Sequence, residues 1–182
     1  MVPDQTVAEL MKLPMHSVDE AREYAPTDPG FYAWWCDVDN LPHSVPVVRH
    51  PENGTSLLYV GIAPDKVGSD GNLRKRLRQH TKGAIGSSTF RLGLAALLWE
   101  DEGWQPIWPA TKVALENDGL AGLSAWQAKH LYVQWCEVEE PWKIEAAVID
   151  ALHPPMNRQH NEGAARNALR GAARRHHDED RD

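Results

Sequence analysis

Residues 57 to 80 contain a compact set of polar side chains that could carry out chemistry together. The apolar run Leu57-Leu58-Tyr59-Val60 is typical of a strand, which we expect to stop at Gly61. A Gly-rich loop follows, and then a basic segment over 72–82 that predicts a helix. Arg76 and His80 are four residues apart, so they would share one face of that helix. The rest of the chain would then supply the wall and the remaining groups of a site.

Positive charge gathers around the same stretch. The formal net charge is −7, yet residues 71–99 contain six Lys or Arg residues and no Asp or Glu. Because salt screens distant charges, a local positive patch on an acidic protein can still bind phosphate groups. The alternative is a solvated helix face, and the charge pattern alone leaves both interpretations open. The six residues are Arg74, Lys75, Arg76, Arg78, Lys82 and Arg91.

Length and composition indicate one globular domain with extensions. The 182 residues, 42% of them hydrophobic and 25% charged, are enough to bury a core. No run approaches eighteen apolar residues and the N-terminus lacks the layout of a secretory signal, so we expect no membrane association and a cytoplasmic protein. Cys36 and Cys136 fit no metal-binding spacing and predict buried free thiols.

Short apolar runs predict three strands, over residues 31–36, 57–60 and 131–136. Helices are predicted over 4–13, from the capping box at Ser17, over 72–82, 89–98, 120–129, from Pro141 to 152, and over 162–175. Strands and helices do not alternate strictly. The expected fold class is therefore mixed α/β (α+β), with a small three-stranded, largely antiparallel sheet flanked by helices.

Common cofactor and hydrolase motifs are missing from the sequence. It contains no GxxxxGK[ST] or GxGxxG, so no nucleotide cofactor is expected. It contains no GxSxG and no HExxH, which argues against a serine hydrolase and a zinc peptidase.

A dispersed set of residues remains, and each member alone has a plain structural interpretation. Strand tyrosines are usually core residues, and a glutamate early in a helix usually interacts with the helix dipole. The set comprises Gly30-Phe31-Tyr32, Tyr59-Val60-Gly61, Arg76, His80, Glu145 and Asn157.

Taken together in this order, the set resembles the GIY-YIG nuclease superfamily. The two tripeptides match the family's motifs with Phe or Val in place of Ile, which keeps the tyrosines and glycines. The segment over 73–80 is similar to the family's helix, in which an arginine precedes a histidine or tyrosine by four residues. The segment Trp142 to Glu145, with Pro154-Pro155-Met156-Asn157 after it, is similar to the family's glutamate helix and terminal Pro-x-x-Asn.

The resemblance implies a divalent-metal phosphodiesterase that acts on nucleic acid, expected to be DNA. One carboxylate with several waters suits Mg²⁺ or Mn²⁺, and Glu145 matches the family's metal ligand. Arg76 would clamp the scissile phosphate, and Tyr59 would activate or orient the attacking water with its pKa lowered by Arg76 or the metal. Tyr32 and His80 would orient the water or share the proton transfer, and Asn157 would hold the site. Expected substrate contacts are Gly61, Arg74, Lys75, Arg78 and Lys82.

Three functional hypotheses follow, with a predicted division into an N-terminal helical extension (1–28), a GIY-YIG nuclease-like domain (29–161) and a C-terminal basic helix with a charged tail (162–182). The first is a stand-alone DNA endonuclease of the restriction, phage-defence or DNA-repair type. The second is a non-cleaving nucleic-acid-binding module that keeps the fold. The third is a structural domain, which scattered site residues would favour. The 26 residues between Tyr32 and Tyr59 predict an inserted surface loop of open role.

Overall fold

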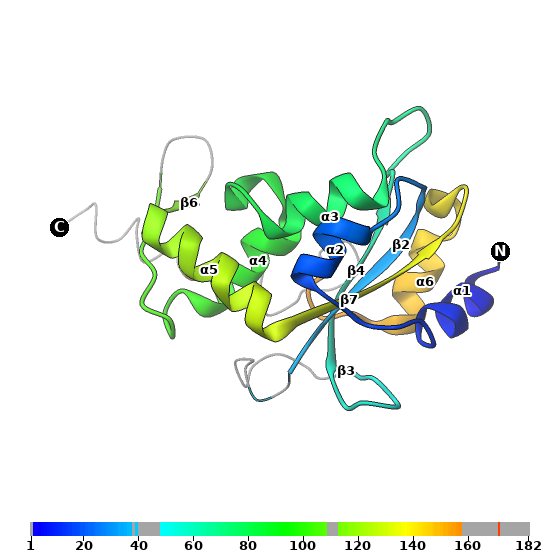
Figure 1. Cartoon of the computed structure of the whole chain (residues 1–182), viewed down its shortest axis with the longest axis horizontal. Coiled ribbons are helices and arrows are strands. Elements are labelled where there is room, and N and C mark those ends of the chain that lie inside the picture. The colour runs from blue at the N-terminus through cyan, green and yellow to red at the C-terminus, as the bar shows by residue number, and fades with distance from the viewer. Residues whose placement is uncertain (1, 38, 40–47, 109–112, 158–170, 172–182) are drawn as a thin grey trace.

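The chain folds around a five-stranded antiparallel sheet with helices on both faces (Figure 1). The structure is a computed structural model, and it describes residues 2–37, 39, 48–108, 113–157 and 171. The fold is mixed α/β, as expected from the sequence. The predicted helix over 162–175 lies outside the described residues, apart from residue 171.

The strands and helices have the following bounds within the described residues. The strands are β1 (His16–Ser17), β2 (Gly30–Cys36), β3 (Val48–Arg49), β4 (Ser56–Ala63), β5 (Pro106–Ile107), β6 (Ala114–Leu115) and β7 (Leu131–Glu137). The helices are α1 (Pro3–Leu10), α2 (Val18–Tyr24), α3 (Leu73–Thr81), α4 (Thr89–Leu98), α5 (Asn117–His130) and α6 (Glu145–Leu152).

The sheet has the strand order β1-β7-β2-β4-β3, so the prediction of three strands was wrong. The three predicted strands form its centre as β2, β4 and β7. The two additional strands are edge pairings of two residues each, too short to show an alternating pattern in the sequence. The strand β4 also continues past Gly61 to Ala63, because Gly61 pairs with Tyr32 in the ladder to β2.

Alternate residues of β2 point into two separate hydrophobic cores, as the two-residue period of a strand requires. Tyr32, Trp34 and Cys36 pack with residues of α2, α3 and α4 on one face. Phe31, Ala33 and Trp35 pack with residues of α1 and α6 on the other. Figure 1 shows these two groups of helices on opposite sides of the sheet. A strand that is buried on both faces lacks polar alternation, which is why residues 31–36 read as a continuous apolar run.

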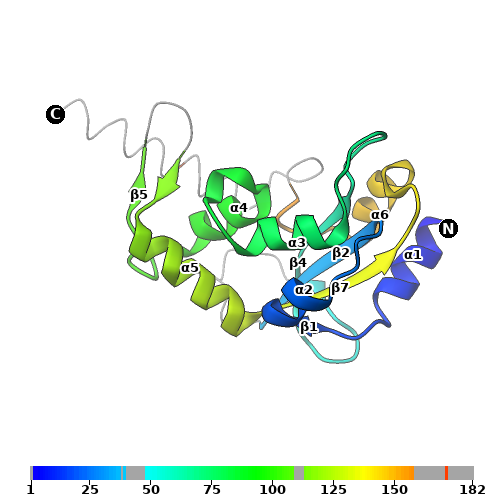
Figure 2. The same cartoon turned by 45° about the horizontal axis from the view of Figure 1, so that its top comes forward.

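Helix α5 runs away from the sheet toward the β5–β6 hairpin (Figure 2). Trp104 and Trp108 flank strand β5, and both are half-buried and pack against the core. No helix in the described part of the chain is both long and apolar enough to cross a membrane.

The start of α6 differs from the prediction by four residues. Pro141 begins a short 3-10 turn, Pro141–Lys143, and α6 itself begins at Glu145. Val148, Ile149 and Leu152 are buried, as the sequence pattern predicts. The helix ends at His153, which adopts the left-handed conformation with φ of 45°. Glu145 therefore lies in the first turn of its helix, at the edge of the sheet, and not in the middle of a helical face.

Candidate functional site

Five of the six predicted catalytic residues line one pocket of about 300 Å³. They come from five separate segments: Tyr32 from β2, Tyr59 from β4, Arg76 from α3, Glu145 from α6 and Asn157 from the segment after α6. The pocket lies at the outer edge of β4, beyond the two residues that β3 covers. Helices from the two opposite faces of the sheet therefore meet at this point. This convergence argues against a coincidental match of scattered residues.

His80, the sixth predicted residue, lies behind the pocket and not in its wall. Its side chain is 2% exposed, and its Nε2 lies 2.7 Å from the Tyr32 hydroxyl. Burial lowers the pKa of His80 to about 3, and the nearby charge of Arg76 adds to this effect. His80 is therefore a neutral hydrogen-bond partner of Tyr32 at ordinary pH. It has no direct path to a water in the pocket.

The two tyrosines differ in their access to solvent. Tyr32 is 1% exposed, whereas Tyr59 is half-buried and lies beside Thr89 in the pocket wall. Burial raises the pKa of both phenols, that of Tyr32 well above its usual range. Two effects act against burial at Tyr59, because a hydrogen bond with Thr89 and the charge of Arg76 both favour the phenolate. The influence of Arg76 has the expected sign, but burial is larger, so the expectation of a lowered Tyr59 pKa was wrong for the protein alone.

Arg76 presents a cationic side chain to the pocket from the face of α3 that also carries His80. Its Nη1 donates a hydrogen bond to Gln79 Oε1 at 3.1 Å. The α3 helix is capped by Asn72, whose side chain accepts the Lys75 amide at 2.9 Å. Leu73 and Leu77 are buried in the core next to His80, on the side of the helix adjacent to Arg76. These contacts fix the direction in which Arg76 points.

The pocket also contains the groups that a hard divalent cation would need. Its lining residues include two carboxylates, those of Glu145 and Asp65. Mg²⁺ prefers oxygen ligands and usually keeps several waters, so one or two carboxylates are a suitable donor set. In the described part of the chain, no group of three or more His, Cys, Asp or Glu residues could hold a metal ion. The two carboxylates that line the pocket would suit a hydrated Mg²⁺ or Mn²⁺, with waters as the remaining ligands.

Asn157 is buried, and its side-chain amide bonds both backbone groups of Val60. Its Oδ1 accepts the Val60 amide at 2.9 Å, and its Nδ2 donates to the Val60 carbonyl at 2.6 Å. The Met156 amide donates to the Leu58 carbonyl at 2.9 Å. The segment after α6 thus satisfies the free edge of β4 as a neighbouring strand would. Asn157 fixes the backbone between Tyr59 and Gly61, which agrees with a role in holding the site.

Because Gly61 has no side chain, it leaves space that another side chain of the protein, that of Tyr32, occupies. A Cβ at this position would overlap the Tyr32 hydroxyl and would lie 2.9 Å from Tyr59 Cε1. Tyr32 and Gly61 are paired across β2 and β4, so the Tyr32 ring lies over the glycine. The Tyr32 phenol fills this space, and the predicted contact of Gly61 with substrate stays a prediction. Gly30 is similar, because a Cβ there would overlap the Cys136 carbonyl of β7.

The other basic residues predicted to bind substrate do not line the pocket. Arg74 Nε donates to the Ala25 carbonyl at 2.6 Å, and Arg78 Nε donates to the Arg22 carbonyl at 3.0 Å. Both bonds tie α3 to α2. Lys75 pairs with Asp70 at 2.9 Å, and Lys82 is exposed after the end of α3. Their roles toward a substrate stay predictions.

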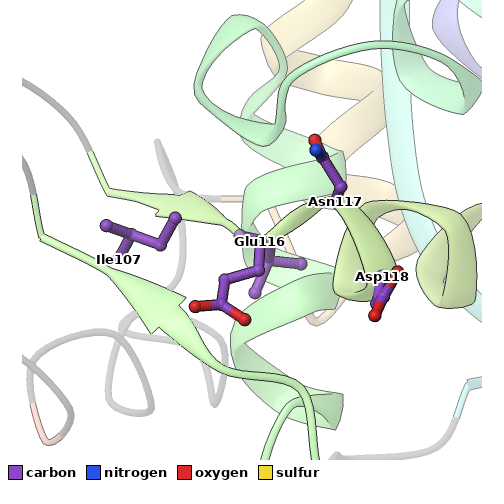
Figure 3. A pocket seen from close by; sticks show the side chains of 5 residues that line it. Ile107, Glu116, Asn117 and Asp118 are labelled. Carbon is purple, nitrogen blue, oxygen red and sulfur yellow. The ribbon is translucent and has the colours of Figure 1, made fainter.

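A second pocket lies between the β5–β6 hairpin and the start of α5 (Figure 3). Its wall is formed by Ile107, Leu115, Glu116, Asn117 and Asp118. The two carboxylates make it unsuited to a polyanion. It contains none of the predicted catalytic residues.

Sequence analysis did not assign three residues of this region to the site. Asp65 and Thr89 line the pocket, and Ser88 contacts His80. Ser88 and Thr89 were recognised only as the start of a helix, and Asp65 lies in a loop with no pattern of its own. Their proximity to the tyrosines depends on the packing of α3 and α4 against the sheet, which no local signal contains.

Comparison with known proteins adds one match. Residues 30–177 match the family model described as GIY-YIG catalytic domain. The comparison with curated proteins found no match, and the comparison with solved structures also found none.

Proposed function

The chain belongs to the GIY-YIG catalytic domain family, and on this premise we propose that it is a divalent-metal-dependent endonuclease that hydrolyses phosphodiester bonds in DNA. The observation that carries the proposal is the convergence of Tyr59, Arg76 and Glu145 on one pocket at the edge of β4. A phenol, a guanidinium and a carboxylate are the group types that water activation, phosphate binding and cation binding require. The family suggests a nuclease, and the metal dependence and the preference for DNA are our inference.

Arg76 is proposed to bind the scissile phosphate. Its guanidinium can donate two parallel N–H bonds to two phosphate oxygens, which a lysine cannot do. Leu73 and Leu77 hold α3 in the core, so the guanidinium is positioned before substrate arrives. Positioned donors stabilise the charge that develops on phosphorus without a cost of reorganisation.

Tyr59 is proposed to accept the proton of the attacking water. It is the more exposed of the two phenols, and it would act as the phenolate. Because burial raises its pKa, loss of its own proton would depend on the positive charge of Arg76 and of the cation that Glu145 would hold. Attack by the water oxygen forms one bond to phosphorus, and the bond to the leaving sugar oxygen breaks. The hydrogen-bonded pair of Tyr32 and His80 would position Tyr59, and Asn157 holds the strand that contains Tyr59 in place.

Glu145 is proposed to hold the cation, and Asp65, which lines the same pocket, would bind it directly or through water. A bound Mg²⁺ or Mn²⁺ would neutralise charge on the phosphate and the leaving oxygen. Because Glu145 begins α6 and Arg76 lies on α3, the cation held by Glu145 and the guanidinium of Arg76 would both act on a phosphate bound in the pocket.

Cleavage and binding assays together test the proposal. The purified protein should nick or cut supercoiled plasmid DNA with Mg²⁺ or Mn²⁺, and EDTA should stop the reaction. Matched single- and double-stranded DNA and RNA oligonucleotides would identify the substrate. Binding measured in EDTA at several salt concentrations should weaken as salt rises, since released counterions drive phosphate binding.

A non-cleaving nucleic-acid-binding module is the alternative. Such a module would bind nucleic acid in a salt-sensitive way and would not cleave it in the presence of either metal. Its binding would be unaffected by Glu145→Ala. The carboxylates of Glu145 and Asp65 count against it, because a polyanion is repelled by two carboxylates that hold no cation.

A further inference from the structure

The Tyr32 hydroxyl is the first member of a hydrogen-bonded chain that leads away from the pocket. His80 Nε2 lies 2.7 Å from Tyr32 Oη, and His80 Nδ1 lies 2.6 Å from Ser88 Oγ. His80 and Ser88 are 2% and 3% exposed. The chain therefore passes from the site into the interior between α3 and the start of α4, where water does not compete for its bonds.

Ser88 has a second bond that constrains the direction of this chain. It is the N-cap of α4, and its Oγ accepts the Arg91 amide proton at 3.0 Å. A serine hydroxyl has one proton to donate. Donation of that proton to His80 Nδ1 completes the hydrogen bonding of both buried groups. His80 is neutral because burial lowers its pKa to about 3, so its single ring proton would then reside on Nε2.

We propose that Ser88 is a positioning residue that holds His80 as the Nε2–H tautomer, so that His80 donates to Tyr32 and Tyr32 directs its own proton toward Tyr59. Nε2–H occupies a lone pair of the Tyr32 oxygen and leaves the phenolic proton free to point elsewhere. The Tyr59 ring lies next to Tyr32 in the pocket lining, with ring centroids 6.3 Å apart and planes at 28°. A Tyr32 hydroxyl that donates to Tyr59 would favour the anion of Tyr59 over its own.

The opposite tautomer would have a different consequence. With the proton on Nδ1, Tyr32 would donate to His80, and Tyr59 would lose a hydrogen bond that stabilises its anion. Ser88 thus selects Tyr59 as the phenol that takes a proton, although Ser88 does not reach the pocket. The tautomer assignment is independent of any activity; only its catalytic consequence rests on the proposed function.

Nitrogen NMR of the histidine-labelled protein tests the assignment directly. Long-range correlations between ring protons and nitrogens identify which nitrogen carries the proton, and His80→Gln assigns the signal. The wild-type protein should show His80 protonated on Nε2. A wild-type His80 protonated on Nδ1, or on both nitrogens, at neutral pH would overturn the proposal without need of any variant at Ser88.

Variants at Ser88 extend the test to catalysis. Ser88→Ala should convert His80 to a mixture of tautomers and lower the cleavage rate about tenfold, as expected for the loss of one hydrogen bond, with DNA affinity unchanged. Ser88→Thr, which keeps the hydroxyl, should restore the wild-type tautomer and most of the rate. The control is Ser87→Ala, an exposed neighbour whose hydroxyl donates to the Ala84 carbonyl at 2.8 Å. Wild-type cleavage with an Nδ1-protonated His80 would contradict this inference alone, whereas Nε2 protonation without cleavage would contradict the proposed function alone.

Discussion

The side chain of Asn157 binds the backbone of Val60 through both its amide oxygen and its amide nitrogen. The two residues are 97 positions apart, and the bonds measure 2.9 Å and 2.6 Å. Val60 lies between Tyr59 and Gly61, so one asparagine sets the position of the motif that contains the tyrosine. The contact also brings the end of α6, and with it Glu145, to the edge of β4.

Replacement of Asn157 should therefore destabilise the protein and disturb the site together. Asn157→Ala leaves the Val60 amide and carbonyl buried without partners, at about 1–3 kcal/mol each, so the free energy of unfolding should fall by about 2–6 kcal/mol. Urea denaturation measures the loss. Asn157→Asp keeps the acceptor but places a buried carboxylate oxygen against the Val60 carbonyl, so it should also destabilise the protein. Equal stability of Asn157→Ala and the wild type would show that the two hydrogen bonds between Asn157 and Val60 do not stabilise the protein.

Gly61 should tolerate no side chain, for a reason internal to the protein. Gly61→Ala places a methyl group where the Tyr32 hydroxyl lies, so either the ring or strand β4 must move. Overpacking of this kind typically costs about 1–3 kcal/mol. The matched control is Gly71→Ala, where the nearest atoms to a Cβ lie 3.3–3.4 Å away. Thermal or urea unfolding should separate the two variants, and similar losses for both would contradict the steric account.

The buried His80 should make the protein less stable in acid. Its folded-state pKa of about 3 lies below the ordinary 6.5, so in this interval the unfolded chain binds a proton that the folded chain does not. Stability contributed by neutral His80 is therefore lost as the pH falls from 6.5 toward 3, by about 1.4 kcal/mol per pH unit. Unfolding free energies at pH 7, 6 and 5 should fall more steeply in the wild type than in His80→Gln. Parallel slopes would mean that His80 accepts a proton in the folded state.

The centre of the fold could be predicted because its elements have strong local signals. The apolar runs over 31–36, 57–60 and 131–136 became β2, β4 and β7, and the capping box at Ser17 starts α2 as predicted. The edge strands β1 and β3 could not be predicted. Two residues contain no periodicity, and their pairing depends on the neighbouring strand.

Five of the six predicted catalytic residues line one pocket, but their arrangement could not be predicted and their roles stay predictions. The order of tyrosines, arginine, glutamate and asparagine along the chain matched a known pattern, and the fold brings them to one pocket. The sequence did not reveal that His80 is behind the wall, that Tyr32 fills the space at Gly61, or that Ser88 contacts the histidine. These facts depend on how α3 and α4 pack on the sheet. That packing cannot be predicted from the local sequence.

Arg76 should not be replaceable by lysine. Arg76→Lys keeps the charge but loses the paired N–H donors, so the rate of DNA cleavage should fall about 100-fold or more, comparable to removal of one donor from an oxyanion site. Lys75→Ala is the control on the same helix, since Lys75 pairs with Asp70 and points away from the pocket lining. It should alter cleavage little and DNA affinity only slightly. Full activity of Arg76→Lys would exclude a bidentate phosphate contact.

Glu145→Gln offers the most direct test of a metal-dependent nuclease at this pocket. The substitution removes one negative charge and keeps the side-chain volume, and Asp150→Asn, on the same helix but outside the pocket lining, is the matched control. Cleavage of plasmid DNA by the three proteins should be measured at increasing Mn²⁺, with unfolding free energy and Mn²⁺ affinity measured in parallel. The account predicts cleavage by the wild type and Asp150→Asn, and loss of both cleavage and Mn²⁺ binding in a folded Glu145→Gln. Undiminished cleavage by Glu145→Gln would contradict it.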